Sequence, residues 1–140
     1  MLAVTHTLTS IAIGTHVGLV PLSFALALLF HLFADTLLHW NIYIERHRWP
    51  YVWVALDVVG GLLLAYWLVP DRFFQAPVLA AIIGGNLPDI TSGLLTLFGK
   101  QPSDVDPFHR LHEGLQHETL SPWKGLVWQV VLVVVAVLLL

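Results

Sequence analysis

The chain contains no cysteine and very little charge. Without Cys, disulfides, thiolate zinc sites and a cysteine nucleophile are excluded, so any metal ligands must be His or carboxylate side chains. Charged residues make up 11% of the 140 residues, against about 25% in an ordinary soluble domain. Because Lys and Arg total only 6 and the net charge is −3, we expect no nucleic-acid surface.

Hydrophobic residues, by contrast, make up 57% of the chain, and the mean hydropathy is +0.79. These values are typical of a membrane protein, and the length suits one domain, so we predict a single integral membrane domain over residues 1–140. The N-terminus lacks the basic segment of a cleaved signal peptide, so we expect His6 to remain in the mature protein.

Five apolar segments predict an all-α polytopic bundle of about four to five transmembrane helices. They cover about 3–19, 21–40, 51–69, 76–98 and 123–140. The first is rich in Thr, Ser, His and Gly, so we expect it to pack against the other helices or to be partly re-entrant. Pro88 removes a backbone donor inside the fourth, where we expect a kink or break.

The strongest signal lies in the second segment, where His31, Asp35 and His39 are spaced four residues apart. On a helix this spacing places them on one face, and ionisable groups at membrane depth are costly and therefore suggest function. Two imidazoles and a carboxylate are plausible ligands for zinc. The alternative is a polar staple that hydrogen-bonds neighbouring helices. His39, near the interface, fits an outer role that supports a ligand.

The linker between the last two segments predicts a short interfacial helix rich in His. Asp106 and Pro107 are typical of a helix start, with Asp as N-cap and Pro in the first turn. The following residues form one expected stripe: His109, His112, Glu113 and His117. His109 and His112 are the better ligand candidates, and Glu113 is either a ligand or a general base. The alternative is a solvated helix that inserts Leu111 and Leu115 into the membrane surface.

Three further residues are candidates of lower specificity. Asp89 follows Pro88, where a break in the helix could direct its carboxylate toward a cavity that holds a metal. A helix cap or hinge is the simpler interpretation. His6 could be a ligand or a hydrogen-bonded core residue. Asp57 lies inside the third segment, where it could orient a ligand or pair with Arg46 or Arg48. His16 and His47 are interpreted as structural or exposed.

The distribution of basic residues predicts the orientation. If all five segments cross, one side holds Arg46, Arg48, Lys100, Arg110 and Lys124, and the other holds only Arg72. The positive-inside rule then places the N-terminus in the cytoplasm, and we expect an inner or plasma membrane location. Nearly every candidate ligand falls on that cytoplasmic side.

Several of these motifs resemble a known family. The Thr5-His6 pair, His31-Leu-Phe-Ala-Asp35, Leu87-Pro88-Asp89-Ile90 and the cluster at 109–112 resemble pieces of the predicted membrane-bound metal-dependent hydrolases. The spacing of His31 and Asp35 and the grouping of His109, His112 and Glu113 are also similar to those of the zinc-dependent phospholipase C superfamily. The chain departs from the first family by lacking its His-Arg-Gly…Thr-His-Ser signature, by carrying Thr91 after the Leu-Pro-Asp-Ile element, and by the order of its motifs.

Together the residues and the resemblance imply a metal-dependent hydrolase at the cytoplasmic interface, acting on a phosphoester or lipid-like small molecule. The expected ligands of one or two divalent ions, zinc or manganese, are His6, His31, Asp35, Asp89, His109 and His112. Glu113 would take a proton from bound water, while His39, Asp57 and His117 are candidates of a second tier. The alternatives are a metal or proton carrier, a haem-binding span, and a structural subunit with His/Asp staples. The oligomeric state stays open.

Overall fold

The structure is a computed structural model that describes residues 1–42 and 49–140, and within those ranges its regular elements are all helices. The helices are α1 (Ala3–Val17), α2 (Val20–Asp35), α3 (Pro50–Leu68), α4 (Ala76–Leu97), α5 (Pro102–Val105), α6 (Pro107–Leu115) and α7 (Pro122–Leu138). The predicted all-α class is therefore confirmed.

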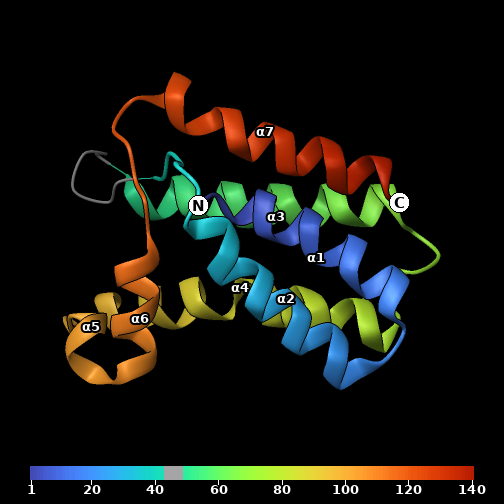
Figure 1. The fold of residues 1–140 in the computed structure, drawn as a ribbon, viewed down its shortest axis with the longest axis horizontal. Coiled ribbons are helices and arrows are strands. Elements are labelled where there is room, and N and C mark those ends of the chain that lie inside the picture. The colour runs from blue at the N-terminus through green and yellow to red at the C-terminus, as the bar shows by residue number, and fades with distance from the viewer. Residues whose placement is uncertain (43–48) are drawn as a thin grey trace.

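Helix α1 lies at the centre of the bundle, in contact with α2, α3, α4 and α7 (Figure 1). This position explains its unusual sequence, because its polar side chains are buried rather than exposed to lipid. The hydroxyl of Thr9 donates to the Thr5 carbonyl and that of Ser10 to the His6 carbonyl, so the helix satisfies them itself. The expectation that this segment packs against other helices is confirmed.

Most helices begin with a proline in the first turn, as Pro21, Pro77, Pro107 and Pro122 do in α2, α4, α6 and α7. The predicted cap of α6 is also confirmed, because the Asp106 side chain accepts a hydrogen bond from the His109 backbone N–H at 3.0 Å. First-turn prolines and the Asp106 cap therefore mark where these helices begin.

Helix α2 is shorter than predicted, which corrects the placement of His39. It ends at Asp35, so His39 does not share its stripe. Beyond the helix the chain pairs its backbone with the segment after α6: the His39 N–H donates to His117 O, and Thr119 N–H donates to His39 O. This pairing satisfies the extended backbone in place of another helical turn.

Two other features of local structure differ from expectation. Helix α6 ends at Leu115, so His117 lies outside it and is exposed. Of the kink or break expected at Pro88, a break is absent, because helix α4 continues through this residue. In the turn before that proline, the Gly85 carbonyl accepts a hydrogen bond from a side chain of α2 (His31), a tertiary contact that supports the weakened turn.

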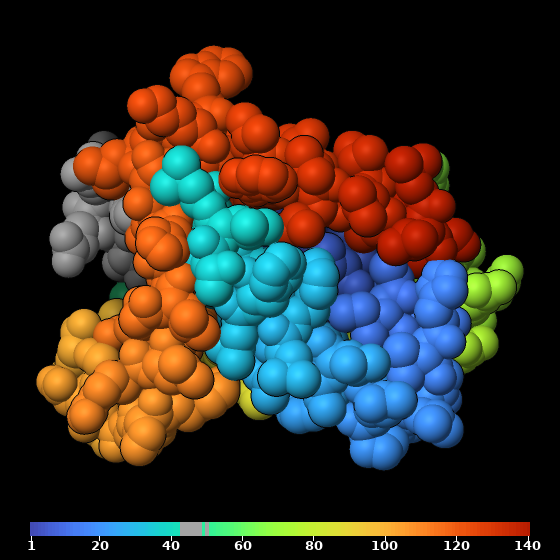
Figure 2. Space-filling view, viewed as in Figure 1, coloured from blue at the N-terminus to red at the C-terminus, as the bar shows by residue number. Residues whose placement is uncertain are grey.

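Among the described residues, α3 and α4 are the helices long and apolar enough to cross a membrane, and α2 and α7 are apolar but shorter. Large apolar side chains are exposed on all four, such as Leu29, Leu63, Ile83 and Val130. The face shown in Figure 2 is formed by α2, α7 and the α5–α6 region. These features are compatible with a membrane protein.

Glycine allows the closest approach between α1 and α4, and we predict that this contact is sensitive to a single methyl group. A Cβ at Gly14 would lie 2.6 Å from Val78 Cα, so the helices would have to separate. Gly14→Ala should cost about 1–3 kcal/mol and lower the melting temperature of the purified protein. Gly60→Ala is the control: a Cβ there meets nothing within 4 Å, and Ala favours helix. Equal melting temperatures for the two variants would contradict this view of the packing.

Candidate metal centre

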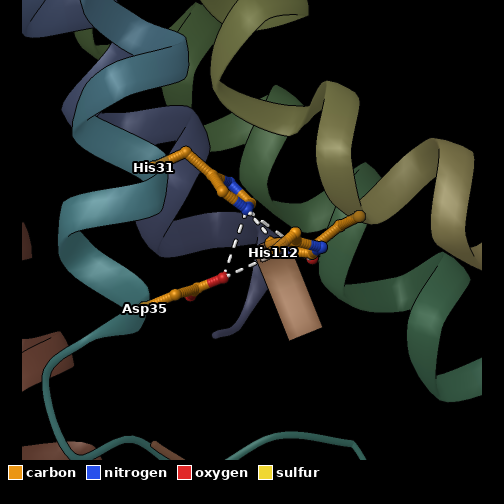
Figure 3. Close-up of side chains that lie close together, drawn as sticks. His31, Asp35 and His112 are labelled. Carbon is orange, nitrogen blue, oxygen red and sulfur yellow. Dashed lines mark hydrogen bonds and ion pairs between the residues drawn. The ribbon is translucent and has the colours of Figure 1, made fainter. Parts of the chain in front are cut away.

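Three side chains from α2 and α6 meet at one end of the bundle (Figure 3). His31 and Asp35 lie one turn apart on α2, with Nε2 and Oδ2 3.2 Å from each other. His112 approaches from α6: its Nε2 lies 3.1 Å from Asp35 Oδ2 and 3.0 Å from His31 Nε2. All three side chains are buried almost completely.

Asp89 of α4 completes a group of four. Its Oδ1 lies 3.4 Å from His112 Nε2 and 3.8 Å from His31 Nε2. One donor atom from each of these residues lies within 4.8 Å of all the others, so His31, Asp35, Asp89 and His112 could hold a metal ion. The side chain of Asp89 is the most accessible of the four, at 28% exposed.

The spacing of the four donors is close to that of a tetrahedral site. Ligands placed 2.0–2.1 Å from a zinc ion at tetrahedral angles are about 3.3–3.4 Å apart. The distances from each imidazole Nε2 to the other imidazole and to the two carboxylates run from 3.0 Å to 3.8 Å, and all four donors lie within 4.8 Å of one another. The side chains therefore surround a point that such an ion could occupy.

The hydrogen bond of His31 determines where its lone pair points. Its Nδ1 lies 2.7 Å from Gly85 O, an atom that can only accept, so Nδ1 carries the proton. In the neutral imidazole, Nε2 then presents a lone pair to the Asp35 and Asp89 oxygens. The Nε2 lone pair and the carboxylate oxygens repel each other. The group therefore needs a cation at its centre or a proton on an imidazole.

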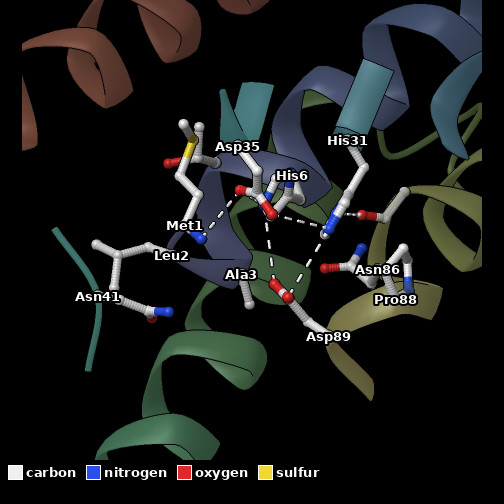
Figure 4. Close-up of polar contacts among 12 residues, drawn as sticks. Met1, Leu2, Ala3, His6, His31, Asp35, Asn41, Asn86, Pro88 and Asp89 are labelled. Carbon is white, nitrogen blue, oxygen red and sulfur yellow. Dashed lines mark hydrogen bonds and ion pairs between the residues drawn. The ribbon is translucent and has the colours of Figure 1, made fainter. Parts of the chain in front are cut away.

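His6 of α1 lies beside the same two carboxylates (Figure 4). Its Nε2 is 3.3 Å from Asp35 Oδ1 and 3.8 Å from Asp89 Oδ2, the second oxygen of each carboxylate. The His6 ring stacks on that of His31 with centroids 3.9 Å apart. Within the described residues neither ring nitrogen of His6 makes a hydrogen bond, although the side chain is buried.

The N-terminal amine also contacts this carboxylate. Met1 N lies 3.1 Å from Asp35 Oδ1, and both groups are fully buried. Asp35 is thus surrounded by nitrogen atoms on both oxygens: His31 and His112 beside Oδ2, and His6 and Met1 beside Oδ1.

A cavity of about 590 Å³ opens beside the group. Its polar lining includes Asp89 and His112 of the candidate centre together with Glu113 and Gln116 of α6, and the rest is largely apolar. Gln116 Nε2 lies 3.1 Å from His112 Nε2. Glu113, predicted as the general base, therefore lines the same cavity as two of the predicted ligands.

His109 does not join the four donors, although it lies on α6 one turn before His112. Its Nδ1 is 2.7 Å from Asp106 Oδ2 and its Nε2 is 3.1 Å from the Thr91 hydroxyl of α4. Since Asp106 accepts from Nδ1–H, the ring links the α6 cap to α4. In this structure His109 holds α6 in place rather than facing the centre.

The second-tier candidates lie outside the group of four. Asp57 accepts hydrogen bonds from the Ala3 and Val4 N–H groups and so caps α1. Its suggested partners Arg46 and Arg48, like His47, lie outside the described residues. His39 is buried against the segment after α6, and burial, with the nearby N-terminal charge, lowers its pKa. His117 is exposed.

Two contributors were missed from sequence. The Gly85 carbonyl, which fixes the His31 tautomer, carries no side-chain signal at all. Gln116 follows His112 by four residues on the same helical face, so the spacing used for the other candidates could have found it.

We predict that Asp106 keeps α6 docked. The backbone N–H and ring of His109 lower the pKa of its carboxyl, so this contribution is present above the ordinary value near 3.9 and is lost as the pH falls through the lower folded value. At neutral pH, Asp106→Ala should speed tryptic cleavage after the exposed Arg110 several-fold, measured by mass spectrometry. Asp104→Ala, an exposed acidic residue of α5, is the control. Equal cleavage rates in the two variants would count against this role.

Comparisons with known proteins add no relative. No protein-family model matches the chain, and neither the curated proteins nor the solved structures contain a match.

Proposed function

We propose that the chain is a membrane-embedded, metal-dependent hydrolase whose divalent ion is held by His31, Asp35, Asp89 and His112. The observation that carries the proposal is the convergence of two imidazoles and two carboxylates whose donor atoms lie within 4.8 Å of one another. Zinc suits two imidazoles and two carboxylates, and manganese is the second candidate.

The protonation of the site supports a metal over a simple hydrogen-bonded staple. A staple needs a donor facing each acceptor, but His31 uses its Nδ1 proton on Gly85 and turns Nε2 toward carboxylate oxygens. His112 Nε2 faces the same oxygens and also the His31 nitrogen at 3.0 Å. The Nε2–H tautomer of His112 can donate to Asp35 Oδ2, but His31 Nε2 then still turns its lone pair toward the Asp35 and Asp89 oxygens. A divalent cation removes this repulsion and uses the remaining lone pairs as ligands.

The proposed chemistry is hydrolysis at the edge of the cavity. A bound divalent ion would supply Lewis acidity and bring the pKa of a coordinated water to about 7. Glu113 lines the cavity with Asp89 and His112, and we assign it the role of general base that accepts a proton from the attacking water. Ser92 Oγ lies 3.5 Å from His112 Nδ1, so it is placed to orient that imidazole while Nε2 binds the ion.

His6 is proposed as the ligand of a second ion. It lies near Asp35 Oδ1 and Asp89 Oδ2, and both of its ring nitrogens are buried without a hydrogen bond among the described residues. An ion there would replace the Met1 amine as the cation beside Asp35 Oδ1. Carboxylates shared between two ions are suited to phosphoester hydrolysis. The resemblance to metal-dependent hydrolases is in accord with this chemistry.

The location of the site supports a lipid-like substrate. We propose four to five membrane-crossing helices, with the N-terminus and the α5–α6 region in the cytoplasm of a cell with an inner or plasma membrane. Three basic residues lie in this region, in accord with the positive-inside rule: Lys100 before α5, Arg110 on α6 and Lys124 in the first turn of α7. The ions would then lie at the depth of lipid headgroups, within reach of a phosphoester.

Metal content tests the proposal directly. Protein stripped with chelator and reloaded with Zn²⁺ or Mn²⁺ should bind the ion, measured by elemental analysis and competition with a metal-sensitive dye. Asp35→Asn and His112→Ala should each weaken binding by more than the about 10–100-fold that loss of an outer-shell partner causes.

His16→Ala is the control, because His16 is exposed at the far end of α1. This variant should keep its metal, and circular dichroism should confirm that all variants are folded. A wild-type protein that binds no ion would overturn the proposal and leave the His/Asp group as a protonated staple.

Loss of the proposed base should affect turnover and spare the metal. Glu113→Gln should lower kcat for a nitrophenyl phosphodiester by about 10²–10⁴-fold, because a general base contributes rate of that order. Its metal content should equal that of wild type. Glu118→Gln, a carboxylate beyond the end of α6 that contacts Asn41, is the control and should keep full activity. Unchanged kcat in Glu113→Gln would remove this residue from the mechanism.

A further inference from the structure

We propose that the cavity between α3 and α4 binds the hydrocarbon chain of the substrate, entering sideways from the membrane. This inference rests on the proposed function, because it places the scissile headgroup at the candidate metal centre. It names the substrate as an amphiphile with a linear apolar chain and a metal-binding head.

The walls of the cavity have the composition that a hydrocarbon chain requires. Both α3 and α4 pack on α1, and the cavity lies between them. Its apolar lining includes Val54, Val58 and Leu62 of α3 and Ile83, Ile90 and Leu94 of α4. Small side chains of α1, Ala3 and Thr7, also line it. A slender apolar chain can therefore lie along α1 between the two helices.

Polarity is ordered along α4. Ile82 and Ile83 precede Asp89 by two turns or less, and α6 packs just beyond it, where His109 meets Thr91. Asp89 therefore separates an apolar section of the cavity from the polar groups of α6. The distance from Ile82 to Asp89 is about 10 Å at 1.5 Å per residue, enough for a medium-length alkyl chain. Beside Asp89, a Cβ at Gly93 would meet nothing within 4 Å, which leaves room for a headgroup.

The opening of the cavity faces the direction from which a lipid would come. Val58 is 37% exposed and Ile83 is 56% exposed, so the walls are not covered by other helices among the described residues. The flanking helices are the two that are long and apolar enough to span a membrane. An amphiphile could therefore move from the bilayer into the cavity without leaving an apolar environment.

The charge of the cavity selects the occupant. Its lining holds Asp57, Asp89 and Glu113, and no Lys or Arg among the described residues. A bilayer lipid lying passively in the cavity would leave this acidic end unmatched, and an anionic head would be repelled by it. With a divalent ion at the centre, an anionic head becomes favourable, so binding of the chain should depend on the metal.

The test measures binding of alkylphosphonates with four to twelve carbons to the metal-loaded protein and to the chelated protein, by calorimetry in one fixed detergent. Within the metal-loaded protein, and after correction for partition of each ligand into protein-free micelles, each added methylene should tighten binding about fourfold, the factor that corresponds to about 0.8 kcal/mol per CH₂ removed from water. Chelated protein should bind at least tenfold more weakly.

Adjacent valines of α3 supply a matched pair of variants. Val58 lines the cavity, whereas Val59 is exposed and does not. Val58→Trp should fill the apolar section and weaken dodecylphosphonate binding at least tenfold, with little effect on butylphosphonate and none on metal content. Val59→Trp should change none of these values, and since both variants share one detergent, partition of the chain into micelles cancels between them.

A photoreactive dodecylphosphonate carrying a diazirine near its chain end gives an independent readout by mass spectrometry. Labelling of α3 and α4 near Val58 and Ile83 is expected, and labelling spread over α7 and the outer face of α2 would overturn the inference. Metal binding with no chain-length dependence, or equal effects of the two tryptophans, would overturn the inference alone and leave the proposed function standing. Failure of the wild type to bind metal would overturn both.

Discussion

The arrangement of the helices at one end of the bundle depends on the burial of a single carboxylate, Asp35. Its side chain is fully buried, and removing an unpaired charge from water costs several kcal/mol even after relaxation. The structure brings nitrogen atoms to both oxygens, from His31 on α2, His6 on α1, His112 on α6 and the Met1 amine. The Met1 amine donates to Oδ1, and the imidazoles offset the charge when they carry a proton toward it or share a cation with it. Helix α6 has few apolar contacts with the bundle, so His112, with His109 one turn earlier, largely decides where it lies.

The same requirement explains why α1 is polar and central. A helix surrounded by α2, α3, α4 and α7 has no face for water or lipid, so its polar groups must meet partners inside the bundle. Thr7 meets Asn86 of α4, Thr5 meets Gln129 of α7, and Asp57 of α3 caps its first turn. Each neighbouring helix thus contacts α1 through at least one polar side chain. These directional contacts set the rotation of each helix about its own axis, which apolar packing alone does not do.

The helices could largely be predicted from the sequence, because apolar runs, prolines and the Asp106 cap are local signals. The pairing of His31 with Asp35 could also be predicted, since it needs only the helical repeat. That His6, Asp89 and His112 would meet this pair was suggested by the orientation of the segments, and the structure brings them together. The end of α2 could not be predicted, because it depends on backbone pairing with residues about eighty positions later, His117 and Thr119. His109 was grouped with the ligands because helical spacing cannot tell whether a ring faces the centre or, as with His109, a hydroxyl on α4.

The accessibility of the four donors bears on what kind of metal site they would form. Structural zinc sites are closed by four protein ligands, whereas catalytic sites keep a position for water or substrate, or expand to five ligands. In the proposed centre His31, Asp35 and His112 are sealed inside the bundle, while Asp89 is 28% exposed, lines the cavity and has the longest contact, 3.8 Å to His31. Three fixed ligands and one movable carboxylate at the cavity edge meet the catalytic requirement, because a shift of Asp89 opens a position on the side where Glu113 and a substrate head would lie. Whether the site would hold a structural or a catalytic ion therefore depends on Asp89, the fourth ligand.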